Sequence, residues 1–471
     1  MAYGSLLLER RRGLHARLVA ALEALAPERV AEQIERLVHH AVRGEVWDKA
    51  VTYCQQAGAR AHDRAAFHEA VASFEHALQA LAHLSEHGDT RGLAIDLRLA
   101  LVRSLAALGE QGQRLALLGE AEALARALDD QARLGRVLAE MASGRRMIGD
   151  LDGALAAGQQ ARVLAAAFGE SALQEQASHT LGQVYYYIGD FAQAAELWRR
   201  NVEAADRESG RPSTDVRIAS RAWLARTLSM LGAFAEGQRH GEEALRLATL
   251  AGRGEIPVMA HGCLGDLYLA KGDLEHAIRV LNQGLALCRA SGYRGSFWRV
   301  IVAGLGYAAA LQGRLAEGRA LLEEAISAES RRGARHAPHR VAWLSEVCRL
   351  AGRGEEAGQH AREALGLARQ QKESGNEALA LHQLGVVQAH ADPPDAEQAE
   401  AYYQQALVLA EELGMRPLVA HCHRGLGTLY AKIDRREPAR AELSTAIALY
   451  RAMDMTFWLP QAEAVLAQVS G

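Results

Sequence analysis

The tripeptide His421-Cys422-His423 carries the side chains best suited to metal chemistry in this sequence. Imidazole and thiolate groups are ligands that zinc prefers. On a helix, however, adjacent residues point about 100° apart, so His421 and His423 diverge and do not chelate as an i, i+4 pair would. We therefore predict no metal here. His421 should face the inner side of the fold, and its two neighbours should pack toward adjacent helices.

The sequence also contains no recognisable catalytic motif. The sequence has no Gly-x-Ser-x-Gly elbow, and its serines and histidines form no recognisable triad. A phosphate-binding loop of the form GxxxxGK[ST] is also missing, because none of the four lysines both follows a glycine and precedes serine or threonine. We predict a protein that is not an enzyme and that uses no cofactor and no metal.

A pattern of small and aromatic residues recurs along the chain. In its best copy, Leu181-Gly182 is followed by Tyr185, Gly189 and Ala194. The same frame returns at Leu264-Gly265 and at Leu426-Gly427, and weaker copies keep parts of it. Successive copies start at residues 101, 141, 181, 224, 264, 305, 344, 384 and 426. A fixed period of about 40 residues indicates a solenoid of stacked units.

Each copy reads as two antiparallel helices joined by a short turn. The Leu-Gly pair and the later Ala should lie where the helices cross, because small side chains let the backbones approach. Glycine at the joint should take the left-handed conformation that ends a helix, as at Gly149, Gly189, Gly272, Gly313 and Gly352. Aspartate after the joint, as at Asp150, Asp190 and Asp273, can cap the next helix.

This frame resembles the tetratricopeptide repeat, whose Leu, Gly, Tyr, Ala and Phe/Trp positions are matched by Leu181, Gly182, Tyr185, Ala194 and Trp198. The standard unit has about 34 residues, so a period near 40 implies helices longer by up to a turn each. The predicted fold is an all-α, right-handed superhelical solenoid with roughly ten hairpins between residues 27 and 471.

The longer unit, the opening 3–15 and the tail segments 412–423 and 450–455 resemble the C-terminal arm of bacterial STAND-type ATPases and class III adenylate-guanylate cyclase signalling proteins. The resemblance implies that residues 1–26 correspond to the end of a winged-helix module and residues 27–471 to the repeat arm. The cyclase and ATPase domains of that family are missing. We therefore expect either a fragment or a gene that starts inside the ancestral one.

In tetratricopeptide arrays the first helix of each repeat lines the concave face, with the residues two and five after the Leu and two before it pointing inward. This resemblance gives the candidate partner-binding residues Arg146, His179, Gln183, Tyr186, Arg226, Asp266, Tyr307, Glu346, Arg349, His382 and Arg424. Such a polar, aromatic strip suits a peptide or protein segment, with Arg and Tyr as anchors. The alternative is that these side chains are only solvated and paired with one another.

Composition agrees with the helical interpretation. Aromatics make up 5% of the 471 residues and there are only 9 prolines, which disfavours sandwiches and barrels. With a formal charge of -4 the chain has no net positive charge, so we predict that it binds neither nucleic acid nor a membrane. Five scattered cysteines, no long apolar run and no signal-like start predict a cytoplasmic protein.

Together these patterns predict a non-catalytic interaction or sensor arm of a bacterial signalling protein, which binds a protein or peptide in its concave groove. An alternative is a structural repeat protein that assembles with itself through the ends of the solenoid. A weaker alternative is cyclase or ATPase activity carried over from full-length relatives.

Overall fold

The computed structural model describes residues 8–25, 31–64, 66–85, 88–207, 214–251, 255–331 and 337–470. The described residues form α-helices and one short 3-10 turn, and no strand occurs among them. Part of the predicted winged-helix-like opening lies outside the described residues. No helix in the described part of the chain is both long and apolar enough to cross a membrane.

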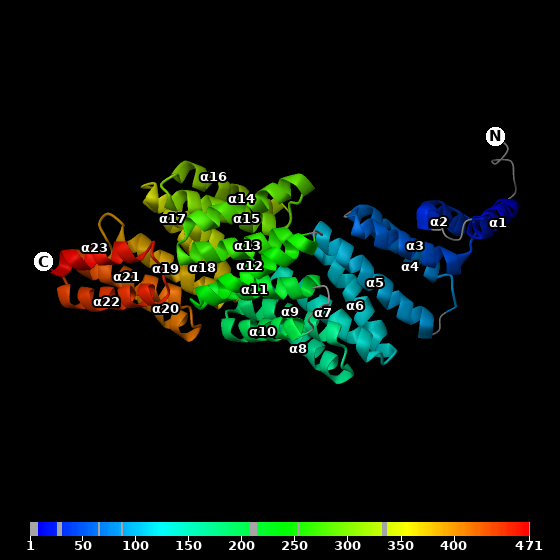
Figure 1. The fold of residues 1–471 in the computed structure, drawn as a ribbon, viewed down its shortest axis with the longest axis horizontal. Helices are drawn as coiled ribbons and strands as arrows, with labels where there is room; N and C mark the ends of the chain where they lie inside the picture. The colour runs from blue at the N-terminus through cyan, green and yellow to red at the C-terminus, as the bar shows by residue number, and fades with distance from the viewer. Residues whose placement is uncertain are drawn as a thin grey trace. The chain divides into compact units, whose positions relative to one another are not determined.

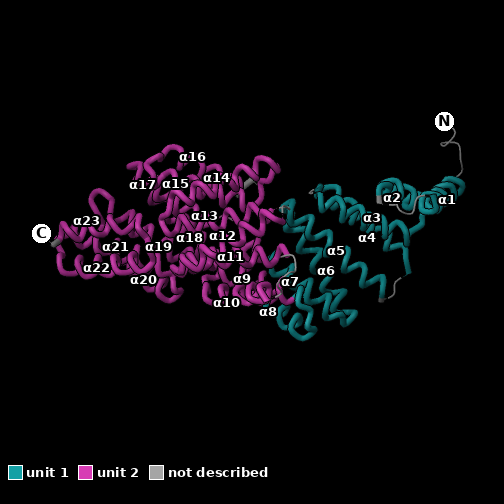
Figure 2. The backbone as a smooth tube through the Cα atoms, viewed as in Figure 1, with its two compact units in different colours: residues 1–145, 159–173 teal, residues 146–158, 174–471 magenta. Residues whose placement is uncertain are grey.

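The chain divides into two compact units, each of which is described by itself (Figure 2). Unit 1 comprises residues 1–145 and 159–173, and unit 2 comprises residues 146–158 and 174–471. The predicted division at residue 26 is not a border between these units and stays a prediction.

Unit 1 begins with single helices that are followed by hairpins (Figure 1). Its elements are α1 (Leu8–Leu25), η3 (Ala31–Gln33), α2 (Ile34–Arg43), α3 (Trp47–Asp63), α4 (Phe67–Leu81), α5 (Gly88–Leu108) and α6 (Gln111–Ala127). Helices α7 (Gln131–Ile148), α8 (Leu151–Phe168) and α9 (Ser171–Ile188) contribute residues to both units.

Unit 2 continues as helix-turn-helix hairpins (Figure 1). Its remaining helices are α10 (Phe191–Arg207), α11 (Asp215–Met230), α12 (Phe234–Ala251), α13 (Ile256–Lys271), α14 (Leu274–Ser291), α15 (Ser296–Leu311), α16 (Leu315–Arg331), α17 (Pro338–Leu350), α18 (Gly354–Gln370), α19 (Ser374–Ala389), α20 (Ala396–Glu412), α21 (Arg416–Lys432), α22 (Arg436–Ala452) and α23 (Leu459–Ser470). From α9 to α21 the odd-numbered helices begin at intervals of 36 to 44 residues, as the period predicts. The predicted fold, an all-α right-handed superhelical solenoid of tetratricopeptide-like hairpins, is confirmed.

The glycine of the Leu-Gly pair lies where two helices meet. A Cβ added at Gly182 would stand 2.7 Å from the indole of Trp198, which is fully buried on the next helix. At Gly427 a Cβ would stand 2.6 Å from Leu443. Since real Cβ atoms do not tolerate such approaches, these positions need glycine, as the repeat frame predicts.

The joints also form as predicted. All five predicted glycines have positive φ angles, between 74° at Gly352 and 105° at Gly189. Asp150, Asp190 and Asp273 each accept a hydrogen bond from the backbone N–H three residues later, at 2.9, 3.1 and 3.3 Å. A left-handed glycine ends the first helix and an aspartate caps the second.

The odd-numbered helices of unit 2 form its inner layer. In the hairpins from α11–α12 to α21–α22 the odd helix packs against the even one, and α11 contacts α13, α13 contacts α15 and α17 contacts α19. No comparable contact joins consecutive even-numbered helices in the described part of the chain. The coil therefore curves toward the odd-numbered helices, which carry the predicted partner-binding strip.

Candidate functional site

All eleven predicted partner-binding residues lie in unit 2, on its odd-numbered helices. Arg146 is on α7, and His179, Gln183 and Tyr186 are on α9. The others follow on successive inner helices: Arg226 on α11, Asp266 on α13, Tyr307 on α15, Glu346 and Arg349 on α17, His382 on α19 and Arg424 on α21. We call this set the inner strip.

Arg226 and Asp266 form the most buried ion pair of the inner strip. Their guanidinium and carboxylate groups are 2.9 Å apart, and the two side chains are 7% and 12% exposed. The guanidinium also lies 5.3 Å from the ring centres of both Tyr186 and Trp223, within the range of cation–π attraction. Burial raises the pKa of Asp266, and the positive charge of Arg226 opposes that rise.

This pair keeps unused hydrogen-bonding capacity. Among the described residues, Arg226 Nε and Asp266 Oδ1 are buried atoms that have no hydrogen-bond partner. Leaving a buried donor or acceptor unsatisfied costs about 1–3 kcal/mol. The site can therefore accept one more donor and offer one more hydrogen bond to a ligand that reaches it.

A second cluster surrounds Glu346. Arg349 donates to this carboxylate through Nη2 at 2.8 Å and Nε at 3.1 Å, and Gln383 donates to it through Nε2 at 3.0 Å. Burial alone would raise the pKa of Glu346, but the hydrogen bonds and charge of Arg349 outweigh it and hold the pKa at about 2. Nearby, Tyr307 stacks on Trp343 with ring centroids 4.7 Å apart and planes inclined by 3°.

His179 belongs to a network that joins α9, α10 and α11. Gln183 Nε2 lies 3.2 Å from His179 Nε2 and donates to it, so Nδ1 carries the proton and faces Ser220 Oγ at 3.0 Å. Burial, followed by the charge of Arg146, lowers the pKa of His179 to about 3. The imidazole is therefore neutral at pH 7.

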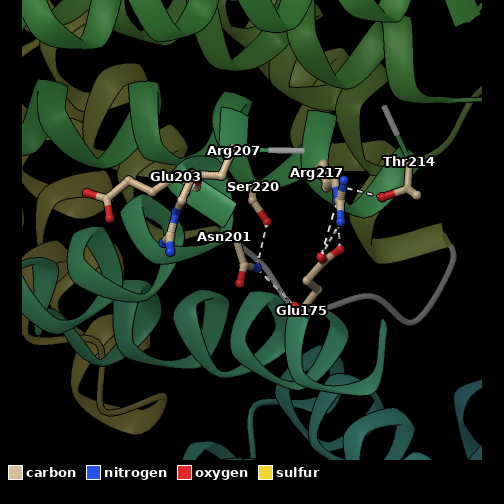
Figure 3. A network of polar contacts seen from close by, with 7 residues as sticks. All are labelled: Glu175, Asn201, Glu203, Arg207, Thr214, Arg217 and Ser220. Atoms are coloured by element: carbon tan, nitrogen blue, oxygen red, sulfur yellow. Dashed lines mark hydrogen bonds and ion pairs between the residues drawn. The ribbon is translucent and has the colours of Figure 1, made fainter. Parts of the chain in front are cut away.

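Asn201 extends this network on the outer side (Figure 3). Its amide donates to Ser220 Oγ at 3.1 Å and to the backbone oxygen of Glu175 at 2.9 Å. The Glu175 carboxylate in turn accepts hydrogen bonds from Arg217, the shortest 2.7 Å long. These contacts join α10 and α11 to α9, the helix that carries His179 and Tyr186.

The last part of the inner strip is formed by His382 and Arg424. The ring of His382 lies 6.1 Å from that of His421, and burial together with the charge of Arg424 lowers the pKa of His382 to about 4. Arg424 donates to Gln461 at 2.8 Å and lies 5.1 Å from the ring centre of Trp458.

In the tripeptide His421-Cys422-His423, Cys422 is fully buried and His423 packs against the neighbouring helix, as predicted. His421 Nδ1 lies 2.7 Å from Tyr450 Oη and His423 Nδ1 lies 2.6 Å from Glu442, and both partners are on α22. The two histidines therefore have different partners. They do not belong to a group of converging metal ligands among the described residues.

Successive turns of unit 2 touch one another. Lys271 and Asp454, 183 residues apart, form an ion pair of 2.6 Å, and Lys372 pairs with Asp152, 220 residues away. A Cβ at Gly232 would overlap Met453, and one at Gly272 would stand 2.8 Å from Phe457. We call this line of contacts the seam. It joins turns that are about five periods apart.

Many side chains of the inner layer are buried. Every residue of α11 from Arg217 to Ser229 is buried, and so are Arg299 and Arg340 on α15 and α17. In an open solenoid the concave face of such helices would be exposed. Within the inner strip, Arg146, His179 and Arg226 are buried and the other eight side chains are partly exposed, so the strip is a partly enclosed, charged surface rather than a fully open groove.

Several residues of this interior were missed by the sequence analysis, among them Trp223, Asn201 and the pair Glu175–Arg217. One usable signal was present. Arg226 and Asp266 occupy the same frame position one period apart, and Arg217 follows Glu175 by 42 residues. Opposite charges one period apart on the inner helices therefore mark pairs between neighbouring repeats.

Comparison with known proteins bears on the fold alone. No family model matches the chain, and no curated protein matches it. Among solved structures, the crystal structure of Rap protein complexed with competence and sporulation factor aligns with a TM-score of 0.57 at 13% identity, covering 77% of this chain and 98% of that one. The Cut9–Hcn1 hetero-tetramer of the APC/C aligns with a TM-score of 0.45 at 12% identity, covering 96% and 93%.

The similarity to Rap protein supports a tetratricopeptide-type repeat. It does not extend to the STAND-type ATPases or the nucleotide cyclases. In fold, this chain is a tetratricopeptide-like helical repeat protein.

Proposed function

We propose that this chain is a non-catalytic interaction protein whose inner strip binds a polypeptide segment. The observation that carries the proposal is the Arg226–Asp266 pair, which is held by Tyr186 and Trp223 and retains one free donor and one free acceptor atom. A peptide backbone offers both complementary groups in each residue. The Rap protein of similar fold, crystallised with competence and sporulation factor, gives further support.

Charge selects the kind of segment. The inner strip carries four arginines against two carboxylates, and its two histidines are neutral at pH 7 because their pKa values are about 3 and about 4. Counted over its own eleven residues, the strip is therefore positive by two charges. An acidic segment, anchored through Arg226 and Arg424, fits this surface best.

The seam gives such a protein a way to report binding. While the seam is closed, a ligand cannot pass between adjacent turns and must enter along the axis of the coil. A ligand that binds more tightly when the seam is parted will shift the population toward the parted state. This differential binding is the sensor mechanism that we propose for the arm.

Within this proposal, the chain is an arm of a bacterial, cytoplasmic signalling protein related to the STAND-type ATPases and class III cyclases, with residues 1–26 as the end of a winged-helix module. The support for this context is the resemblance of the sequence segments 3–15, 412–423 and 450–455. A nucleotide hydrolysis or cyclisation assay on the purified chain tests the non-catalytic part, since turnover above a blank would contradict it.

The binding proposal can be tested with random decapeptides displayed on phage. Selection on the immobilised full chain should enrich peptides rich in Asp and Glu. The best peptide, labelled with fluorescein, should bind at least about tenfold more weakly to Arg226→Leu and to Arg424→Gln. Arg239→Leu, an exposed position on α12, is the matched control and should bind like the wild type.

Two results would contradict the proposal. One is a selection that yields no acidic bias. The other is equal affinity of the selected peptide for the wild type and both inner-strip variants, provided that their circular dichroism and melting temperatures show folded protein.

A further inference from the structure

Three histidines from two helices of unit 1 converge at one point. The potential ligand nitrogens of His15 on α1 and of His39 and His40 on α2 all lie within 4.8 Å of one another. The Nδ1 atoms of His15 and His40 are 2.7 Å apart. Among the described residues, no other group of three or more histidine, cysteine or acidic side chains converges in this way.

The local backbone brings the two helices close enough for this. Gly44 follows α2 directly, and a Cβ at this position would stand 2.7 Å from the backbone nitrogen of Ala16 on α1. Arg12 on α1 then forms a 2.8 Å ion pair with Glu45 beyond the turn. Only a glycine allows α1 to lie this near the end of α2, and this approach places His15 beside His40.

Few side chains of helix α1 are buried against the rest of unit 1. Only His15 and Val19 are buried on it, whereas Leu8 and Leu25 are 77% and 81% exposed. Besides Arg12, its Glu23 accepts hydrogen bonds from Lys49 and Tyr53 on α3. Exposed or half-exposed ion pairs contribute about 0–1 kcal/mol each, so those of Arg12 and Lys49 add little to the buried contact of Val19.

The contact between His15 and His40 determines where their ring protons lie. At present one Nδ1 must donate its proton to the other. Metal binding at both Nδ1 atoms needs only that the donor ring carry this proton on Nε2 instead.

We propose that His15, His39 and His40 form a Zn²⁺ site, with water as the fourth ligand, that fastens α1 to α2. Imidazole is a preferred zinc ligand, and three protein ligands with one open position is a known coordination of this ion. With bonds of about 2.0–2.1 Å in a tetrahedron, two ligand nitrogens stand about 3.3 Å apart, so the rings of His15 and His40 must separate by roughly half an ångström. The exposed His39 leaves the ion access from solvent.

Metal binding can be measured on the full chain after treatment with a chelator. Co²⁺ should bind with one-to-one stoichiometry and give visible d–d absorption bands, and Zn²⁺ should remove these bands. His39→Ala, at an exposed position, should bind at least about tenfold more weakly with an unchanged circular dichroism spectrum. His68→Ala and His76→Ala, exposed positions on α4, are the matched controls and should bind like the wild type.

Whether the bound ion holds α1 against α2 can be measured separately, by hydrogen exchange. At a free Zn²⁺ concentration of 100 times Kd, hydrogen exchange of the α1 amides should slow by about 100-fold in the wild type. The same addition should leave exchange in His39→Ala unchanged. The site is refuted if the wild type gives no Co²⁺ bands or if His39→Ala binds Co²⁺ equally well. The fastening is refuted if Zn²⁺ binds but α1 exchanges at the same rate.

Discussion

Lys271 Nζ lies 2.6 Å from Asp454 Oδ2, although 183 residues separate them in the sequence. One comes from the end of α13 and the other from the turn between α22 and α23. Together with Lys372 and Asp152, this pair marks the seam between successive turns of the coil.

A carbodiimide, which joins an amine to a carboxylate without a spacer, should cross-link both pairs of the seam. We expect peptides that link Lys271 to Asp454 and Lys372 to Asp152 in the mass spectrum of the digested protein. Lys49–Glu23 in unit 1 is the positive control, with 2.5 Å between its charged groups. Formation of the control product without either seam product would show that the turns do not touch.

Replacing Glu346 should weaken the protein in a pH-dependent way. Its pKa of about 2 lies below the usual value of 4.5, so its contribution to folding is present above pH 4.5 and is lost as the pH falls toward 2. Glu346→Gln should lower the free energy of unfolding by about 2 kcal/mol at pH 7. In urea titrations this difference should shrink at pH 3. Glu355→Gln, exposed on α18, should show no difference at either pH.

The two neutral histidines of the inner strip should make the protein less stable in mild acid. In the unfolded chain they take up protons near pH 6.5, whereas in the folded chain their pKa values are about 3 and about 4. The unfolded state therefore binds more protons between these values, and stability falls as the pH drops from 6.5 to 4.

Each of these histidines contributes at most about 1.4 kcal/mol per pH unit to that slope. His382→Gln should reduce the slope of unfolding free energy against pH over this range. His76→Gln on α4 should not. An unchanged slope in His382→Gln would mean that the imidazole is already solvated in the native state.

The network around Asn201 should be sensitive to truncation (Figure 3). Asn201→Ala removes the donor to the backbone oxygen of Glu175 and to Ser220, and leaves the buried oxygen of Glu175 one partner short. We expect a loss of about 1–3 kcal/mol in the free energy of unfolding, measured in urea. Truncating Gln238, which bonds only Glu242 on the exposed side of α12, should cost much less.

The five cysteines should resist thiol reagents in the native protein. All are free and buried, and burial raises the pKa of Cys54 to about 11 and that of Cys263 to about 12. Since only the thiolate reacts, no colour should develop with a disulfide reagent at pH 8 until denaturant is added. Rapid reaction of one or more thiols without denaturant would show that unit 1 or unit 2 opens locally.

The repeat frame could be predicted in detail because its signals are local. A glycine such as Gly189 indicates a left-handed residue at the end of a helix, and a pair such as Leu181-Gly182 indicates the place where two helices cross. Neither signal depends on distant parts of the chain. The same frame placed Arg226 and Asp266 on the inner layer. Each of these predictions depends on a few residues within one period.

Closure of the coil could not be predicted in this way. It depends on a small rotation between neighbouring repeats, summed over about five of them, and no single residue specifies that rotation. Lys271 and Asp454 are both ordinary charged residues at helix ends, and nothing in their local sequence marks them as partners. The cluster of His15, His39 and His40 was missed for a related reason, since its members come from two helices whose close approach at Gly44 is not marked in the local sequence.

The contacts across the seam change how the repeats of unit 2 depend on one another. A linear array tolerates the loss or gain of a repeat, because each unit touches only its neighbours along the chain. Here a unit also touches another about five repeats away, as Gly232 does with Met453. Deleting a hairpin that lies between two such partners would shift their pairing by a whole repeat. The number of hairpins between the partners of the seam is therefore constrained by the contacts that they make.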